Sequence, residues 1–560
     1  MIELALAATV VLNGLWDFRL AEQAPMEEVR LPDFAADDKM IVPGCWDAMN
    51  DYFDKRGTGC YRRTFTLEKD VVNAFLVVDG CCLRSKYWID GREIGFSKLP
   101  WSRIEFATGP LAAGEHVIVA AVDSLTDEAK VKLFHDFYDF YAPGGFHHGV
   151  WLELQTTPVE IRRLVVRTRD YRTGLVEIEA LYAQEGASDF TASVSFDGKP
   201  AKDIAFRNRR ATVTVPDFRL WSPEHPNLHT VTIKQCSARF GIRAVGTASK
   251  RITLNGEPVY IKGVNRHESH WEFGATTPRQ LMYDDIRTIK DLGCNFIRGS
   301  HYAQCEEFLD LCDELGVLVW EESLGWGNRE DQLKDPEFCA LQVEQTRLMA
   351  RQSINHPCVI VSGFLNEPAA ETEACKALVK TLTEALRTED TGHLVAYATC
   401  RNDNDISHGF TDIIAYNAYP CQYVHTMKRG TDAEMRKCIR DCHEEIVRYF
   451  RDTYKDERPI IVSETGIKAD YGMRDPRGKA QNTEDFQAQY EKMMLEELFD
   501  MPEVAGVVIW QYGDTKTYTR VGYISSRPYG VNTGGLFDIY RRPKLTVDVV
   551  RELFRGKREK

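Results

Sequence analysis

Two glutamates, each at the end of an apolar run, are the strongest candidates for chemistry in this sequence. Glu367 follows residues 359–361, whose β-branched side chains predict a strand buried on both faces of a parallel sheet. Glu464 follows residues 460–462 in the same way. Paired carboxylates without a cofactor motif indicate glycoside hydrolysis, with one group as nucleophile and the other as acid/base. The acid must be protonated while the nucleophile is ionised, so their environments must separate their pKa values.

Motifs for other kinds of catalysis are missing from the sequence. There is no GxSxG elbow and no Gly-rich phosphate loop, and His267-Glu268-Ser269-His270 has the wrong spacing for an HExxH zinc site. The 15 cysteines are scattered, without structural zinc spacing. We therefore predict no metal and no cofactor.

Strands and helices alternate after residue 247, which predicts a (β/α)8 barrel over residues 248–560. The expected strands cover 259–261, 295–297, 317–320, 359–361, 393–397, 413–415, 460–462 and 507–509, and the expected helices 279–292, 306–315, 336–354, 373–387, 432–454 and 483–500. Active sites of such barrels are built at the carboxyl ends of the strands. Glu367 and Glu464 would follow strands four and seven, nearly opposite in the ring.

Polar and aromatic side chains follow the other predicted strands too, as a sugar site requires. Asn366 could hold the sugar 2-OH, a contact that strengthens in the transition state of glycoside hydrolysis. Tyr419 could donate a hydrogen bond to Glu464. The candidates for substrate binding at these strand ends are His301, Asn366, Asn417, Tyr419 and Trp510.

Two all-β regions precede the barrel. Residues 1–155 contain short alternating segments at 61–67, 74–78, 87–89 and 116–122, which predict a sandwich or jelly roll. Asp90-Gly91 is a hairpin signal. Residues 156–247 continue with segments at 160–168, 175–183, 191–196, 211–215 and 229–233, the pattern of an immunoglobulin-like sandwich.

Composition and charge limit the partners and the compartment. The net charge of −14, without basic clusters, argues against nucleic acid and anionic membranes. No apolar run reaches the 18 residues of a membrane span. The apolar N-terminus lacks the positive residues of a signal peptide, so we favour a first strand over a signal. Scattered, reduced cysteines predict a cytoplasmic protein.

Several motifs together resemble glycoside hydrolase family 2 over nearly the whole chain. They are Asn13-Gly14-Leu15-Trp16, Val42-Pro43-Gly44, Gly263-Val264-Asn265-Arg266-His267-Glu268, Ser300-His301-Tyr302, Asn366-Glu367-Pro368 and Ser463-Glu464. The resemblance implies a jelly-roll sugar-binding domain, an immunoglobulin-like domain and a catalytic barrel. It also implies a retaining exo-β-glycosidase with Glu367 as acid/base and Glu464 as nucleophile. Many members are dimers or tetramers, so a homo-oligomer is expected. Some bind Mg²⁺ near the acid, where Glu268 and His301 could help.

Within the family, the chain is most similar to the β-glucuronidase branch. His135-Asp136-Phe137 matches an HDF segment that reaches the active site there, and Asn532 matches one half of an Asn-x-Lys pair that clamps the sugar carboxylate. This sequence has Gly534 in place of the lysine, and Thr465 where the branch has Tyr. A carboxylate requires a fixed cation. We expect Arg527 to supply it; the other candidates are Arg520 and Arg329, and each of the three could instead be a solvated surface charge.

Three functions remain open from the sequence. The first is hydrolysis of terminal β-linked hexuronic acids, either glucuronides or galacturonides. The second is a β-galactosidase with the same machinery. The third, a non-catalytic carbohydrate-binding protein, would predict loss of one carboxylate, yet Glu367 and Glu464 are both present. The sugar and the aglycone preference cannot be read from one sequence.

Overall fold

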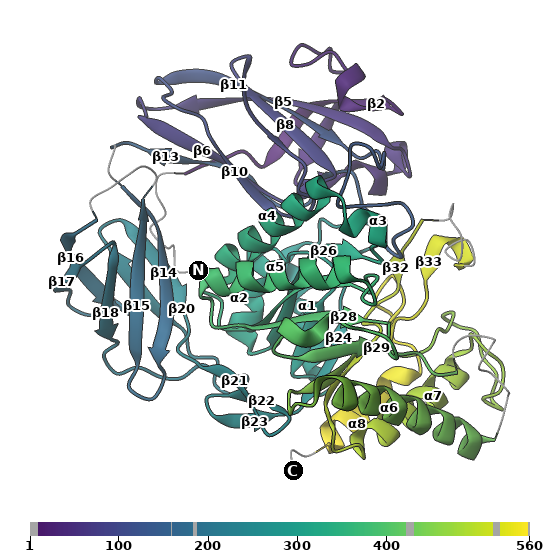
Figure 1. Ribbon diagram of the computed structural model, residues 1–560. Helices are drawn as coiled ribbons and strands as arrows, with labels where there is room; N and C mark the ends of the chain where they lie inside the picture. The colour runs from purple at the N-terminus through teal and green to yellow at the C-terminus, as the bar shows by residue number, and fades with distance from the viewer. Residues whose placement is uncertain (1–8, 158–159, 183–187, 422–430, 519–526, 558–560) are drawn as a thin grey trace.

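The computed structural model describes residues 9–157, 160–182, 188–421, 431–518 and 527–557. Antiparallel sheets form the N-terminal part, and a closed eight-stranded parallel barrel forms the C-terminal part, so the predicted fold class is confirmed (Figure 1). The predicted domain boundaries after residues 155 and 247 stay predictions. The second of them falls inside strand β21 (Val245–Ala248).

The first region folds into two main antiparallel sheets. One has the order β1-β13-β6-β10 and the other β3-β2-β5-β11-β8-β9. Asp90 and Gly91 form the two-residue loop between β8 and β9, both with positive φ, as the hairpin signal predicted. The strands are β1 (Thr9–Val11), β2 (Gly14–Glu22), β3 (Asp38–Val42), β5 (Gly57–Leu67), β6 (Asn73–Asp79), β8 (Arg84–Ile89), β9 (Arg92–Ser97), β10 (Arg103–Ala107), β11 (Gly114–Asp123) and β13 (Val150–Gln155).

The second region is a sandwich of a three-stranded and a four-stranded antiparallel sheet, ordered β14-β15-β18 and β17-β16-β19-β20. Alternate side chains of both sheets pack into one core. The sequence patterns did not reveal β17 and β20. The strands are β14 (Ile161–Asp170), β15 (Leu175–Tyr182), β16 (Phe190–Phe196), β17 (Lys202–Phe206), β18 (Arg210–Thr214), β19 (His229–Ile233) and β20 (Cys236–Phe240).

The barrel closes where its first strand pairs with its last, β24 with β31. Its strands are β24 (Ile261–Asn265), β25 (Phe296–Gly299), β26 (Leu318–Trp326), β27 (Val359–Asn366), β28 (Leu394–Thr399), β29 (Ile414–Asn417), β30 (Ile460–Thr465) and β31 (Val504–Ile509). All eight expected strands exist. The first begins at Ile261 rather than Val259, because Val259 belongs to the short sheet of β21, β22 (Arg251–Leu254) and β23 (Glu257–Val259) that leads into the barrel.

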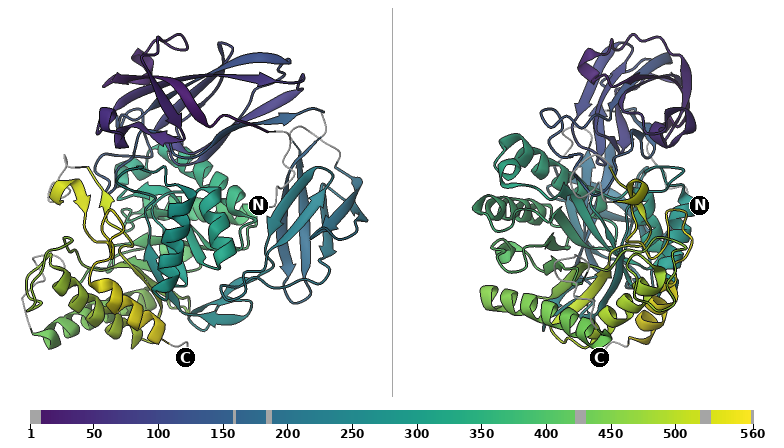
Figure 2. Two further views of the ribbon diagram at one scale, coloured as in Figure 1. Left: turned by 180° about the vertical axis from the view of Figure 1, so that it is seen from behind. Right: turned by 90° about the vertical axis from the view of Figure 1, so that its right-hand side faces the viewer.

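Helices surround the barrel and bury the outer faces of its strands (Figure 2). Their ends follow local chemistry: Thr431 and Glu434 form a capping box at the start of α6, and Gly316 takes a left-handed conformation after α2. Helices α3 and α8 were not anticipated. The helices are α1 (Arg279–Asp291), α2 (Glu306–Leu315), α3 (Glu330–Leu333), α4 (Pro336–Ser353), α5 (Glu373–Glu389), α6 (Asp432–Tyr454), α7 (Glu484–Phe499) and α8 (Thr546–Gly556).

The N-terminal sheets pack against the barrel through a shared apolar core. Trp101 stacks on Tyr302, which follows β25, with ring centroids 4.5 Å apart. Phe140, on the long connection after β11, packs against His267 and His301 at the strand ends. This contact brings the connection between β11 and β13 to the mouth of the barrel.

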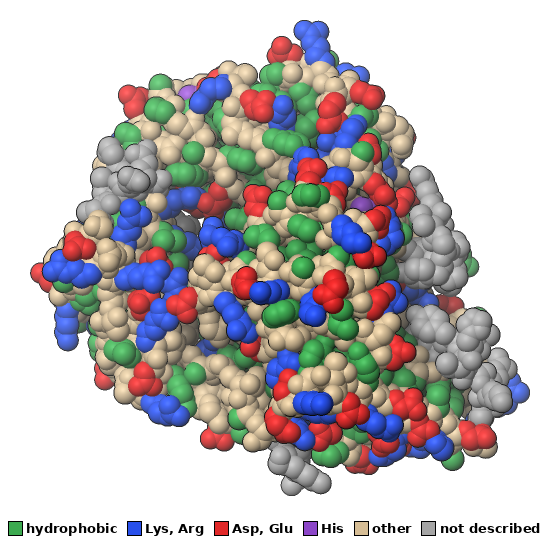
Figure 3. Space-filling model, in the orientation of Figure 1, with side chains coloured by type: hydrophobic (Ala, Val, Ile, Leu, Met, Phe, Trp, Pro, Cys, Tyr) green, Lys and Arg blue, Asp and Glu red, His purple; other side chains and the backbone are tan. Residues whose placement is uncertain are grey.

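Acidic and basic side chains alternate over the face of the molecule drawn in Figure 3, without a large patch of one sign. None of the helices in the described part of the chain is long and apolar enough to cross a membrane. The expected homo-oligomer stays a prediction.

Candidate active site

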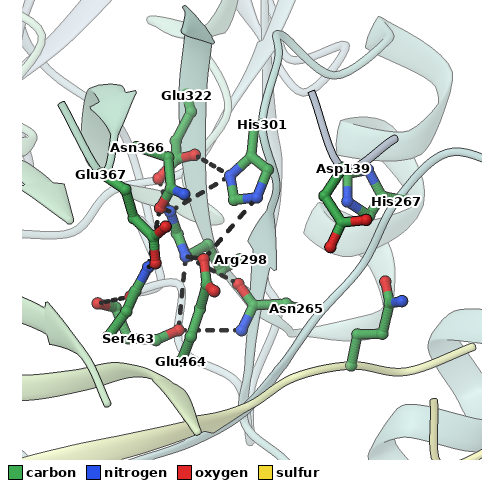
Figure 4. A network of polar contacts seen from close by, with 12 residues as sticks. Asp139, Asn265, His267, Arg298, His301, Glu322, Asn366, Glu367, Ser463 and Glu464 are labelled. Atoms are coloured by element: carbon green, nitrogen blue, oxygen red, sulfur yellow. Dashed lines mark hydrogen bonds and ion pairs between the residues drawn. The ribbon is translucent and has the colours of Figure 1, made fainter. Parts of the chain in front are cut away.

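Arg298, on β25, joins the polar groups at the mouth of the barrel (Figure 4). Its fully buried guanidinium donates to Glu322 Oε1 and Glu464 Oε1, each at 2.7 Å. It also donates to Asn366 Oδ1 at 2.8 Å and Asn265 Oδ1 at 3.1 Å. Sequence reasoning gave this arginine no role. The available signal was a charged residue inside an otherwise apolar strand, where burial requires charged partners.

Two strong donors favour the ionised form of Glu464. Its Oε1 accepts the hydrogen bond from Arg298, and its Oε2 accepts one of 2.6 Å from the Tyr419 hydroxyl. Burial raises the pKa of Glu464, but the charge of Arg298 and the Tyr419 hydrogen bond act in the opposite direction. The contact predicted between Tyr419 and Glu464 is present in the structure.

Glu367 lies in a different electrostatic environment. Its side chain accepts a hydrogen bond of 2.8 Å from Asn417 Nδ2, an uncharged donor. Burial, together with the negative charge of Glu464, raises the pKa of Glu367 to about 7. The backbone at Glu367 has φ 51, a conformation that is uncommon for a residue with a side chain and that concentrates at functional sites.

The two carboxyl groups therefore differ in the way that acid/base and nucleophilic roles require. Glu464 has a guanidinium partner that favours its ionised form, whereas Glu367 faces the charge of Glu464 and favours its protonated form. A single proton shared by the pair rests on Glu367 near neutral pH.

The pH dependence of catalysis follows from the proton on Glu367. A general acid must be protonated at the start of the reaction, and its pKa of about 7 means that this form is lost as the pH rises through neutrality. We expect kcat/KM to fall above about pH 7, tenfold for each further unit. Asn417→Ala removes a hydrogen bond that lowers the pKa of Glu367, so the alkaline limb of its pH profile should move to higher pH. An activity that rises through pH 8 would contradict this assignment.

Asn366 is oriented by the same network. Its Oδ1 accepts from Arg298 and, at 3.1 Å, from Asn417 Nδ2. This arrangement leaves the buried Nδ2 of Asn366 without a hydrogen-bond partner among the described residues. A buried donor without a partner is costly, so this amide suits a substrate hydroxyl.

His301 and Trp510 form a flat wall at the mouth of the barrel. Their rings stack with centroids 5.3 Å apart and an interplanar angle of 14°. Burial, with the nearby charge of Arg298, lowers the pKa of His301 well below its usual value, so the imidazole is neutral. His301 Nδ1 lies 3.1 Å from Glu322 Oε2, which fixes the ring.

The structure places Asp136 away from this network and brings in Asp139 instead. Asp136 is half-buried and lines a surface cavity of about 240 Å³ together with Arg56 and Lys516. Asp139, three residues later, is buried, and it lies near enough to Glu367 for its charge to help raise the pKa of that residue (Figure 4). The loop carries two similar segments, His-Asp-Phe and Tyr-Asp-Phe, and it is the second that reaches the site.

The three arginines considered as a carboxylate clamp lie in different places. Arg527 is buried, and its Nε donates to Asp139 Oδ1 at 3.1 Å. Asn532 Nδ2 donates to the other oxygen of Asp139 at 3.0 Å. Arg329 is largely exposed and pairs with Asp331. Arg520 lies outside the described residues.

Possible metal ligands meet between the N-terminal region and the barrel. Ligand atoms of His148, Glu268 and Cys305 lie within 4.8 Å of one another. Glu268 accepts from Thr277 at 3.1 Å and lies 2.9 Å from His148 Nε2, so its oxygens are already paired. A mixed nitrogen, oxygen and sulfur set does not suit Mg²⁺, and His301 faces Glu322 instead. The expectation of no metal stays a prediction.

Two family models match this chain, and both describe the same family of glycosyl hydrolases. Residues 245–557 match the family model described as glycosyl hydrolases family 2, TIM barrel domain, and residues 159–243 match the model described as glycosyl hydrolases family 2. The chain is 28% identical over 446 residues to the β-glucuronidase of Canis lupus familiaris, a match that covers 75% of this chain and 65% of the dog protein. This chain therefore covers less than two thirds of the length of the dog protein.

Two further similarities concern other sugars. A β-galactosidase of Vibrio cholerae is 28% identical over 421 residues, covering 64% of this chain and 40% of that protein. The crystal structure of a β-galacturonidase from Eisenbergiella tayi bound to galacturonate has a TM-score of 0.86 and 28% identity, and the match covers 99% of this chain and 98% of that one.

Proposed function

Because the chain belongs to glycoside hydrolase family 2, we propose that it is a retaining exo-β-glycosidase that removes terminal hexuronic acids, either glucuronic or galacturonic. The observation that carries the catalytic part is the pair of Glu464, ion-paired with Arg298, and Glu367, whose pKa is raised to about 7. One carboxylate and one carboxylic acid in a single pocket are what a double displacement needs.

In the first step, Glu464 attacks the anomeric carbon while Glu367 gives its proton to the glycosidic oxygen. The bond to the aglycone breaks, and a covalent glycosyl ester forms at Glu464. Tyr419 and Arg298 orient the nucleophile. The unpaired Nδ2 of Asn366 binds the sugar 2-OH, where charge development strengthens the contact.

In the second step, Glu367 accepts a proton from water, and the resulting hydroxide attacks the anomeric carbon. The ester breaks, the sugar leaves with its original configuration, and Glu464 returns to its ionised state. Loss of the negative charge on Glu464 during the intermediate lowers the pKa of Glu367, because that charge helped to raise it. The same residue can therefore act first as an acid and then as a base.

A buried arginine and a buried asparagine beside the catalytic network support hexuronides. Buried Arg527 and Asn532 converge on Asp139 beside the catalytic network. Buried charge is costly unless it has a function or a partner, and arginine is well suited to carboxylate recognition. The similarity to the Eisenbergiella tayi enzyme, which was crystallised with galacturonate, supports the same sugar class.

A β-galactosidase is the second candidate, and one contact favours it. Asp139 pairs with Arg527 and so neutralises the arginine that the sugar carboxylate would use. A neutral sugar would instead need hydroxyl acceptors, which Asp139 could provide. The match to the Vibrio cholerae β-galactosidase keeps this candidate open.

A panel of nitrophenyl glycosides separates the two candidates. We expect the β-galacturonide or the β-glucuronide to have a higher kcat/KM than the β-galactoside, because a buried charged hydrogen bond adds about 1.5–3 kcal/mol to binding. Nitrophenyl α-glycosides of the same sugars are the control and should not react. If the galactoside is cleaved well and both uronides are inert, the hexuronide assignment is wrong.

A further inference from the structure

Lys468, which sequence reasoning did not consider, lies beside residue 534, where this chain has glycine in place of the clamp lysine. Lys468 follows β30, four residues after Glu464. The next residue, Ala469, donates its backbone N–H to the carbonyl of Thr533 at 3.1 Å. Lys544 Nζ ties the two segments together, because it donates to Ala469 O at 2.7 Å and to Thr533 O at 3.0 Å. Residue 468 is therefore held alongside residues 532–534.

The glycine at position 534 explains why a cation must come from another segment. A Cβ atom at Gly534 would lie 3.1 Å from Trp510 Cδ1 and 3.2 Å from Asn532 Oδ1, closer than ordinary contacts. A side chain there would require Trp510, which stacks on His301, or Asn532 to shift by a few tenths of an ångström. The close packing around Gly534 favours a charge that is delivered from the neighbouring segment.

The charges around Asp139 leave one cation without a partner. Arg527 and Asn532 both bind Asp139, so the arginine is already neutralised. Lys468 is half-buried and has no hydrogen bond or ion pair within the described part of the chain. Asp139 and Arg527 balance each other, and Lys468 adds a positive charge beside them that Asp470, two residues later, faces as well. This charge is complementary to one carboxylate.

We propose that Lys468 binds the carboxylate of the terminal sugar and thereby determines the preference for hexuronides over neutral hexosides. The inference rests on the proposed function and adds the residue that recognises the sugar. Lys468 follows β30 and lies near enough to Asp139 and Arg527 for both charges to act on its pKa. Its ammonium forms an ion pair with the carboxylate of the substrate.

Lys468 titrates within the pH range of an activity assay, which provides a second test of the proposal. Burial, with the charge of Arg527, lowers its pKa to about 8, while the charges of Asp139 and Asp470 act in the opposite direction. The cationic form therefore predominates below pH 8 and is lost as the pH rises through this value. The titration of Glu367 affects every substrate equally, so it cancels in the ratio of uronide to galactoside activity.

The experiment compares Lys468→Met and Lys468→Arg with the wild type on nitrophenyl β-galacturonide, β-glucuronide and β-galactoside. Loss of one charged hydrogen bond should lower kcat/KM for the preferred uronide in Lys468→Met by about 10- to 100-fold, with the galactoside unchanged or improved. Lys468→Arg keeps a cation and should retain most uronide activity. Lys479→Met is the matched control, because Lys479 lies in the same loop with an exposed side chain.

The pH profile gives an independent readout that a structural role would not produce. In the wild type, the ratio of uronide to galactoside kcat/KM should fall between pH 7 and 9, and in Lys468→Arg it should stay constant over that range. Where the galactoside is too slow to measure, inhibition by galacturonic acid and by galactose supplies the same ratio.

The outcomes separate this inference from the proposed function. If the wild type cleaves no uronide, the proposed function is wrong. Suppose instead that the wild type cleaves a uronide. If Lys468→Met cleaves it equally well, or loses uronide and galactoside activity in equal proportion, only the role of Lys468 is wrong. A selective loss of uronide activity in a variant with unchanged Tm supports it.

Discussion

Glu464→Gln should reduce turnover of every glycoside by roughly 10⁴-fold or more, because the variant has no nucleophile to form the glycosyl ester. An amide oxygen still accepts the hydrogen bond from Arg298, so the network around this arginine keeps most of its contacts. The protein is therefore expected to fold, with a Tm close to that of the wild type. Steady-state rates on the nitrophenyl panel, together with a thermal unfolding curve, test both statements.

A matched control is available in Glu491, on α7. It is fully buried like Glu464 and accepts the Ile467 N–H at 3.3 Å, but it touches none of the catalytic groups. Burial raises the pKa of Glu491 to about 8, so it is already uncharged at neutral pH. Glu491→Gln should keep most of the activity. Activity near the wild-type level in Glu464→Gln would rule out Glu464 as the nucleophile.

Glu367→Gln should lose about 10²- to 10⁴-fold in rate, and the loss should depend on the leaving group. A glycoside with an alkyl aglycone needs a proton on the departing oxygen, whereas a dinitrophenolate leaves without one. The loss should therefore be large for the alkyl glycoside in the first step. For the dinitrophenyl glycoside, the first step should stay fast and the intermediate should accumulate, visible as a burst of product.

Azide provides the control for this second variant. It is an anionic nucleophile that needs no general base, so it should accelerate breakdown of the intermediate in Glu367→Gln and give the β-glycosyl azide. It should not accelerate Glu464→Gln, which forms no ester. The alkaline limb of the pH profile should also disappear in Glu367→Gln, because the group that titrates near pH 7 is gone. Equal losses on all leaving groups, without rescue by azide, would exclude Glu367 as the acid/base.

The proposed catalytic pair could be singled out by sequence reasoning because barrel geometry is regular. Once eight βα units are recognised, any residue just after a strand lies at the mouth of the barrel. Glu367, Asn417 and Tyr419 are joined to Glu464 or to one another by hydrogen bonds for this reason. The partner of the proposed nucleophile was harder to assign, because Arg298 is one of many polar residues at strand ends. Only its contacts with two glutamates and two asparagines distinguish it.

Sequence reasoning could not determine which loop side chains reach the site. Asp136 and Asp139 are each preceded by His or Tyr and followed by Phe, and they lie in a connection without periodicity, so no pattern could tell which one faces the barrel. The packing of Phe140 on His267 turns Asp139 inward. Sequence reasoning sought the cation for the sugar carboxylate in the loop around Arg527. The structure brings Lys468 beside Asn532 through a backbone hydrogen bond between segments 64 residues apart.

The sequence by itself determined the order of strands and helices, the family and the residues that end the barrel strands, because these depend on local periodicity and on motifs. Only the tertiary structure decided the protonation of Glu367, the pairing of Glu464 with Arg298 and the charge of the cluster at Asp139. Electrostatic energy depends on distance and burial, and segments distant in the chain set both. We therefore propose that sugar selection depends on contacts between the segment after β30, the loop before Phe140 and the segment around Asn532.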